Sequence, residues 1–66
     1  MRIKVHTQFG EFISIAEEVT EVQMAALEKA LEFIATEGMP LSFKGHGGSV
    51  LIPSGTLKNA VIVIEA

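Results

Sequence analysis

Four residue types with versatile side-chain chemistry are missing from this sequence of 66 residues. It contains no cysteine, no aspartate, no tyrosine and no tryptophan. Without cysteine there is no disulfide, thiolate metal site or thiol nucleophile, and without aspartate there is no Ser-His-Asp triad. The two histidines, His6 and His46, lack the His-x-x-x-His or Glu-x-x-His spacing of a metal site. We therefore predict no catalytic residue, no metal site and no cofactor, so the protein is not expected to be an enzyme.

Basic residues and long apolar runs are also scarce. Five lysines and arginines against eight glutamates give a net charge of −3, which argues against the broad basic surface of a non-specific nucleic-acid binder. Every apolar run ends well short of the ~20 residues that span a bilayer. The alternating start of the chain is unlike a signal peptide, and the lack of cysteine fits a reducing compartment. We predict a soluble, cytoplasmic protein that does not bind membranes.

The chain is short for the amount of apolar material that it carries. Hydrophobic residues make up 48% of it and charged residues 20%, with no repeat or linker, so we expect one domain over residues 1–66. A chain of this length buries only about 60% of the surface that its unfolded form exposes. Since disulfides and metals are excluded, a partner subunit is the remaining way to supplement the core. The composition therefore predicts a homo-oligomer.

One helix is clearly marked at both ends. Thr20 and Gln23 match the two positions of a capping box, Gly38 is placed for a left-handed C-cap, and Pro40 prevents continuation. These signals predict a helix over Glu21–Glu37. At helical spacing, one apolar stripe should face a sheet, and it consists of Met24, Leu27, Leu31 and Ile34.

A second apolar strip runs beside the first on the same helix. We call it the helix strip, and it consists of Val22, Ala26, Ala30 and Phe33. A helix that is apolar over more than half of its circumference should touch more than its own sheet. Two interpretations remain open: a curved sheet wraps around the helix, or the helix strip is buried against another subunit.

The N-terminal strands are predicted from alternation over residues 2–7 and 11–16. A three-residue loop at 8–10, with Gly10 left-handed, would pair Val5 with Ile13 and Ile3 with Ile15. The outer face of this hairpin would then carry Arg2, Lys4, His6, Phe12 and Ser14. Cations around an aromatic ring suggest a platform for single-stranded nucleic acid, and the alternative is an ordinary solvated face.

Phe9, near the tip of the hairpin, is a second aromatic residue in an unusual position. It either folds back over the sheet edge or anchors a partner. The rest of the chain predicts strands at 41–44, 49–52 and 60–65. The last is apolar at successive positions, as expected of a strand covered on both faces, by sheet-on-sheet closure or by another subunit. The predicted fold class is α+β: a hairpin, one amphipathic helix and three short strands, with the helix packed on a mostly antiparallel sheet.

Two loops contain residues that phosphate sites use. The first, Gly45-His46-Gly47-Gly48, is either a plain hairpin turn or a nest of backbone amides that binds an anion or nucleotide with Lys44 and His46, at an interface between subunits. The second, residues 53–59, has the wrong glycine spacing for a P-loop and is expected to be a connection with a helical turn and Leu57 pointing inward. The loops lie at opposite ends of strand 49–52, so one chain cannot combine them.

These features favour a non-enzymatic interaction protein that acts as a homo-oligomer on another protein, as an inhibitor, adaptor or assembly factor would. Its expected anchors are the exposed apolar residues Phe9, Phe12, Val22, Ala26 and Phe33. The first alternative is a nucleic-acid-binding module that uses the Arg2, Lys4, His6 and Phe12 face. The second is a binder of a small anionic ligand at Lys44 and residues 45–48.

Overall fold

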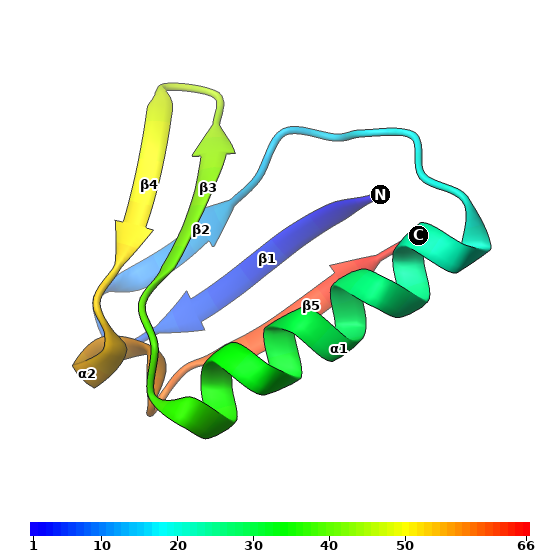
Figure 1. Cartoon of the computed structure of the whole chain (residues 1–66). Helices are drawn as coiled ribbons and strands as arrows, with labels where there is room; N and C mark the ends of the chain where they lie inside the picture. Colours follow the sequence, from blue (N-terminus) through cyan, green and yellow to red (C-terminus); the bar gives the residue numbers. More distant parts are fainter.

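Five strands and two helices make up the protein, for which a computed structural model describes all 66 residues. In chain order the elements are β1 (Arg2–Thr7), β2 (Gly10–Ile13), α1 (Glu21–Glu37), β3 (Leu41–Gly45), β4 (Gly48–Ile52), α2 (Ser54–Leu57) and β5 (Val61–Glu65) (Figure 1). One antiparallel sheet has the order β2-β1-β5, and β3 and β4 form a second. The predicted α+β class is confirmed. Neither helix is long and apolar enough to cross a membrane.

Helix α1 begins and ends where its capping residues predict. The Thr20 hydroxyl oxygen accepts from the Gln23 backbone amide at 3.2 Å, and the Gln23 side-chain oxygen accepts from the Thr20 amide at 2.9 Å. Gly38 is left-handed, with φ 68° and ψ 38°, and its amide donates to the Ile34 carbonyl. The reciprocal bonds satisfy amides that the first helical turn leaves free. The predicted bounds of the helix are therefore confirmed.

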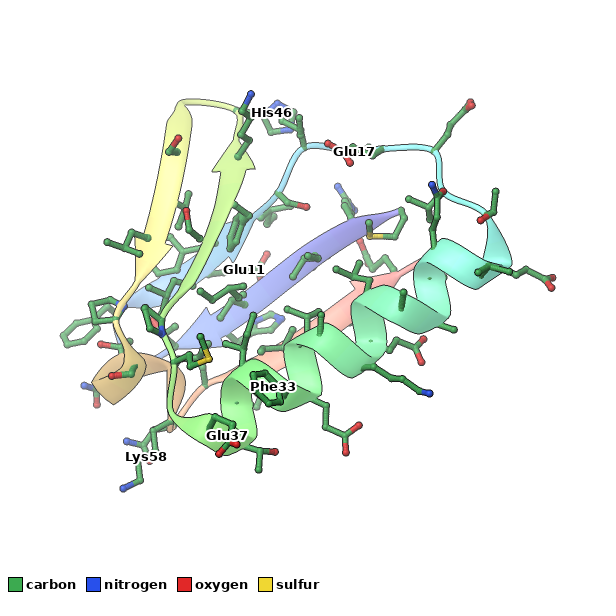
Figure 2. All side chains as sticks on the ribbon, in the orientation of Figure 1. Glu11, Glu17, Phe33, Glu37, His46 and Lys58 are labelled. Carbon is green, nitrogen blue, oxygen red and sulfur yellow. The ribbon has the colours of Figure 1, made fainter.

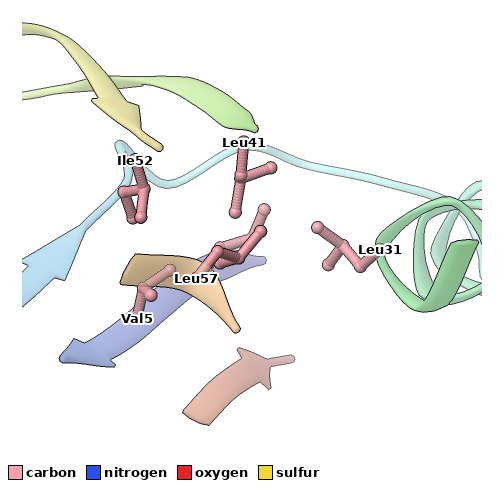
Figure 3. Close-up of a cluster of buried hydrophobic side chains, with 6 residues drawn as sticks. Val5, Leu31, Leu41, Ile52 and Leu57 are labelled. Atoms are coloured by element: carbon pink, nitrogen blue, oxygen red, sulfur yellow. The ribbon is translucent and has the colours of Figure 1, made fainter. Parts of the chain in front are cut away.

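The core lies between the two sheets and is closed on its third side by α1 (Figure 3). Its six buried residues come from five elements: Ile3, Val5, Leu31, Leu41, Ile52 and Leu57. Three of the four residues of the predicted core stripe of α1 are confirmed, because Leu31 is buried and both Leu27 and Ile34 pack against this cluster, whereas Met24 does not. Leu57 reaches the core from α2, as the 53–59 connection predicts. Each layer alone would expose its apolar face, so the three layers depend on one another.

The pairing of β1 with β2 differs from the prediction by one residue. Val5 lies opposite Phe12, Lys4 opposite Ile13, and Thr7 opposite Gly10. The loop is therefore a two-residue turn, and Gly10 follows it with φ 132°. Residues directly opposite each other point to the same face of a sheet, so a shift of one residue exchanges the faces of β2. Phe12 consequently packs toward the core, and Ile13 lies on the outer face.

Strand β2 also ends earlier than predicted, at Ile13, because the chain changes partner there. The Ser14 amide still donates to the Ile3 carbonyl of β1 at 2.9 Å, but the next amide, of Ile15, donates to the Lys44 carbonyl of β3 at 3.0 Å. Ser14 also forms an isolated bridge with Gly45. This crossing links the two sheets. Ser14 is only 6% exposed, so its predicted place on an outer face is wrong.

Strand β5 has one covered face and one open face. Ile62 and Ile64 pack against the core, whereas Val61 is 61% exposed on the opposite face, together with Val63. The expectation that a second sheet of the same chain covers this face is wrong. Within its sheet β5 is also an edge strand, paired only with β1. Its outer face and its free edge are thus both open to a partner.

Candidate functional site

The helix strip is uncovered. Val22 is 81% and Phe33 57% exposed, and Ala26 and Ala30 between them are exposed as well. Phe33 lies on the side of α1 that is turned away from β5 (Figure 2). Within one chain no curved sheet wraps around the helix, so that interpretation is wrong. The strip is a continuous apolar surface with two large side chains at its ends and two small ones in the middle.

Of the two aromatic residues predicted as anchors in the first hairpin, one is exposed and one is not. Phe9 is 72% exposed in the β1–β2 turn, and the Thr7 hydroxyl oxygen fixes that turn by accepting from the Phe9 amide at 3.0 Å. A ring so exposed does not cover the sheet edge. Phe12 is half-buried against the core, because the register places it opposite Val5. Phe12 therefore takes part in core packing and is not fully exposed, and its role as an anchor stays a prediction.

The outer face of the β2-β1-β5 sheet does not form the expected basic platform. Arg2 and Lys4 both contact the Glu65 carboxylate, Lys4 at 3.3 Å, and His6 Nδ1 lies 3.1 Å from Glu11 Oε2. The hydrogen bond from Arg2, supported by Lys4, holds the pKa of Glu65 below its ordinary value of 4.5 against a smaller opposing effect of desolvation.

This pairing and the shifted register remove the features on which the nucleic-acid interpretation depended. Each basic side chain of β1 has a glutamate beside it, so the face carries little excess positive charge to attract phosphates. The aromatic ring that would stack on a base, Phe12, points to the other side of the sheet. A stacking platform needs rings and cations on one surface.

Two of the three glycines in the β3–β4 hairpin are required by the backbone, each for a different structural reason. Gly45 pairs with Gly48, so His46 and Gly47 form a two-residue turn, and Gly48 follows it with φ 133°. This construction repeats the β1–β2 turn, where Gly10 holds the same position. At Gly45 a Cβ would lie 3.3 Å from the Ile13 carbonyl oxygen, whereas at Gly47 it would meet nothing. Close approach and positive φ thus account for two of the three glycines as parts of a turn.

The proposed anion ligands of this hairpin are not gathered around a cavity. Lys44, His46 and Gly47 are exposed at the tip, and His46 lies at the far end of the molecule from Lys58 and α2 (Figure 2). The prediction that one chain cannot combine the two loops is confirmed by this separation. Binding of an anion between subunits stays a prediction. Nowhere in the chain do three or more histidine or acidic side chains come together in a way that could hold a metal ion.

A groove between α1 and β5 was not predicted. Its volume is about 380 Å³, and its lining comes from α1, from β5 and from the segment before β5: Glu28, Leu31, Glu32, Ala35, Leu57, Lys58, Ala60, Ile62 and Ile64. The floor is apolar, the helix wall carries two carboxylates, and Lys58, from the segment before β5, adds one positive charge. Neither Glu28 nor Glu32 forms an ion pair within the chain. The signal in the sequence was the apolar run at 60–64, but the order of the strands, which makes β5 an edge, is not readable from it.

The comparisons with known proteins give no relative from which a function follows. No family model matches the chain, and no curated protein or solved structure is significantly similar to it. The arguments about function therefore rest on three surfaces of the chain itself: the helix strip, the exposed Phe9, and the groove between α1 and β5.

Proposed function

We propose that this protein is a non-enzymatic, cytoplasmic interaction protein that acts as a homo-oligomer on another protein, in the manner of an inhibitor, adaptor or assembly factor. The observation that carries the proposal is the exposed helix strip, in which Val22 is the most exposed large hydrophobic residue of the chain and Phe33 is exposed by more than half. Contiguous apolar surface of this kind is typical of interaction sites. Phe9 adds a separate exposed aromatic residue, a residue type that often anchors protein interfaces.

Self-association through the helix strip is favoured by the shape of the strip. Ala26 and Ala30 allow two helices to approach closely, while Val22 and Phe33 lie at the ends of the strip. In a twofold dimer each of these residues is used twice. The two copies of Val22 and Phe33 make four large side chains, and burying them contributes at most about 6–12 kcal/mol, which offsets much of the ~4–15 kcal/mol that association costs.

Light scattering behind a sizing column at micromolar concentration tests the oligomer. The chain mass is 7.1 kDa, and we expect a mass of at least twice that value. Phe33→Ser should shift the protein toward the monomer. Phe9→Ser is the matched control, because it makes the same change at an exposed position outside the strip and should leave the mass unchanged. A wild-type protein that runs as a fully folded monomer at every concentration contradicts the homo-oligomer.

A further inference from the structure

We propose that the groove between α1 and the free edge of β5 binds an extended segment of another protein as an added β-strand. The segment has alternating apolar side chains that enter the groove and basic side chains beside them. This inference rests on the proposed function in one respect only, namely that the protein acts on another protein. It does not depend on the oligomeric state.

The backbone of β5 offers hydrogen bonds at this edge. Ile3 of β1 accepts from Ser14 on the β2 side, and backbone groups alternate along an antiparallel strand. The even-numbered residues of β1 therefore face β5, where their partners are Val61, Val63 and Glu65. By the same alternation, the amides and carbonyls of Ile62 and Ile64 point to the free edge. Those groups are the ones that an added strand would bind.

The edge lacks the devices by which edge strands usually resist pairing. Proteins protect such edges with lysines, prolines, bulges or a covering element. β5 has four apolar residues in succession, no proline, and one charged residue, Glu65, whose charge is already paired with Arg2 and Lys4. Of the other edge strands, β2 has only four residues, which include a glycine and a glutamate, and β4 contains a glycine and a serine and is followed directly by Pro53. The open polar groups and the apolar composition coincide only at β5.

The side chains around the groove specify the chemistry of the bound segment. Residues of an added strand that lie opposite Ile62 and Ile64 point to the same face as these two isoleucines, toward α1. Apolar side chains at these alternate positions would cover the exposed parts of Ile62 and Ile64. The lining carries two carboxylates, Glu28 and Glu32, against one cation, Lys58, so its net charge is negative. The unpaired carboxylates on the helix wall complement lysine or arginine at the flanking positions of the segment.

A second copy of this chain fits the same edge less well than an isolated strand. Antiparallel pairing of β5 with its own copy places the twofold axis between the two strands and both α1 helices on one face of the combined sheet. Helix α1 forms one wall of the groove with four residues, so it borders the place that a neighbouring strand would occupy. Packed helices need 8–10 Å between their axes, and two copies of α1 would compete for this space.

A synthetic peptide supplies the test: acetyl-Lys-Thr-Val-Thr-Val-Thr-Lys-amide, titrated into the wild-type protein while its backbone amides are followed by NMR. We expect the Ile62 and Ile64 amide signals to shift. We expect the peptide to pair antiparallel to β5. Methylating the backbone nitrogens of the two valines should then abolish binding, because in an antiparallel pair the valines opposite Ile62 and Ile64 direct their amides at β5. Methylating the central threonine nitrogen should leave binding intact, since that amide points away from β5. Equal binding of the two methylated peptides overturns the proposal.

Charge reversal in the groove is the second arm of the experiment. Glu32→Lys should weaken binding of the lysine peptide about fivefold and favour the same peptide with glutamate at both ends. Glu37→Lys is the matched control, because it makes the same change on α1 outside the groove and should alter neither affinity. An unchanged affinity in Glu32→Lys overturns the proposal, and so do shifts confined to the helix strip. Protection of the Ile62 and Ile64 amides from exchange in a peptide-free dimer also overturns it, since a second copy would then occupy the edge.

Failure of this inference can be distinguished from failure of the proposed function. If the protein is monomeric by light scattering and still binds the peptide at Ile62 and Ile64, the homo-oligomer is contradicted and the groove site is supported. If the protein is an oligomer that Phe33→Ser converts toward the monomer, and it does not bind the peptide, only the groove site is contradicted.

Discussion

Ser14 and Ile3 hold each other by two hydrogen bonds, one of which uses a side chain where a strand would use its backbone. The Ser14 amide donates to the Ile3 carbonyl at 2.9 Å, and the Ile3 amide donates to Ser14 Oγ at 2.7 Å. The hydroxyl in turn donates to the Ile15 carbonyl at 3.1 Å. The serine side chain thus completes the ladder of β1 at the point where the chain leaves it for β3.

Removing this hydroxyl should destabilise the fold. In Ser14→Ala the buried Ile3 amide loses its acceptor, which costs about 1–3 kcal/mol. Urea unfolding measures the change in the free energy of unfolding. Ser49→Ala is the control, because Ser49 is exposed and its side chain makes no hydrogen bond in the chain, so its effect should stay within about 0.5 kcal/mol. Equal effects of the two substitutions would show that the Ser14 hydroxyl has no structural role.

Alanine should destabilise the β3–β4 hairpin at two of its three glycines and be tolerated at the third. Gly48→Ala forces a side chain into positive φ and should cost about 1–3 kcal/mol. Gly45→Ala should also destabilise, because the new Cβ crowds the Ile13 carbonyl oxygen. Gly47→Ala should be neutral or slightly stabilising, since the site is open and its φ is not positive. Thermal unfolding ranks the three variants, and a Gly47→Ala protein as unstable as Gly48→Ala would contradict the described turn.

The Glu65 carboxylate should make stability depend on pH in the acidic range. Its pKa in the folded protein is lowered by Arg2 and Lys4, so the unfolded chain binds a proton more readily than the native one. The stabilisation is therefore fully present above the ordinary pKa of 4.5 and is lost as pH falls through the lower native value. Glu65→Gln should remove this component. We expect the wild type to lose more stability than the variant between pH 6 and pH 3, and parallel curves would refute the pairing.

The capping box of α1 provides a prediction with an internal control. Thr20→Ala removes the acceptor of the Gln23 amide and should cost about 1 kcal/mol. Thr36→Ala makes the same chemical change at an exposed position inside the helix, where alanine is the better helix former, and should be neutral or stabilising. Chemical denaturation measures the free energy of unfolding of both variants, which should decrease in Thr20→Ala and stay equal or increase in Thr36→Ala. A stabilising Thr20→Ala would mean that the cap is not formed in solution.

The ends of α1 were predictable because each is determined by residues within a few positions of it. Thr20, Gln23 and Gly38 act on neighbouring backbone groups, so their spacing alone locates the helix. The core stripe follows from the same local geometry. Short-range signals of this kind are complete in the sequence, which is why the predicted bounds and the predicted buried face agree with the structure.

The register of the first hairpin was not predictable in the same way. Apolar residues occur at both odd and even positions of this segment, namely Ile13 and Ile15 on one face and Phe12 on the other. Alternation therefore permits either face of β2 to be buried. The choice is made by Gly45, which lies beside the Ile13 carbonyl and bridges to Ser14, some thirty residues further along the chain. The groove was missed for a related reason. Its two walls come from α1 and β5, and only the tertiary arrangement shows that β5 is an edge strand.

The position of β1 between β2 and β5 also determines when the fold can form during synthesis. Arg2 and Glu65 are 63 residues apart in the sequence and are partners in the sheet. Until β5 has been synthesised, the side of β1 that faces it has no partner, and the β1–β2 ribbon alone is at best marginally stable in water. A nascent chain that stops before Val61 should therefore stay unfolded and open to proteases. The sheet closes only once the residues of β5 have left the ribosome.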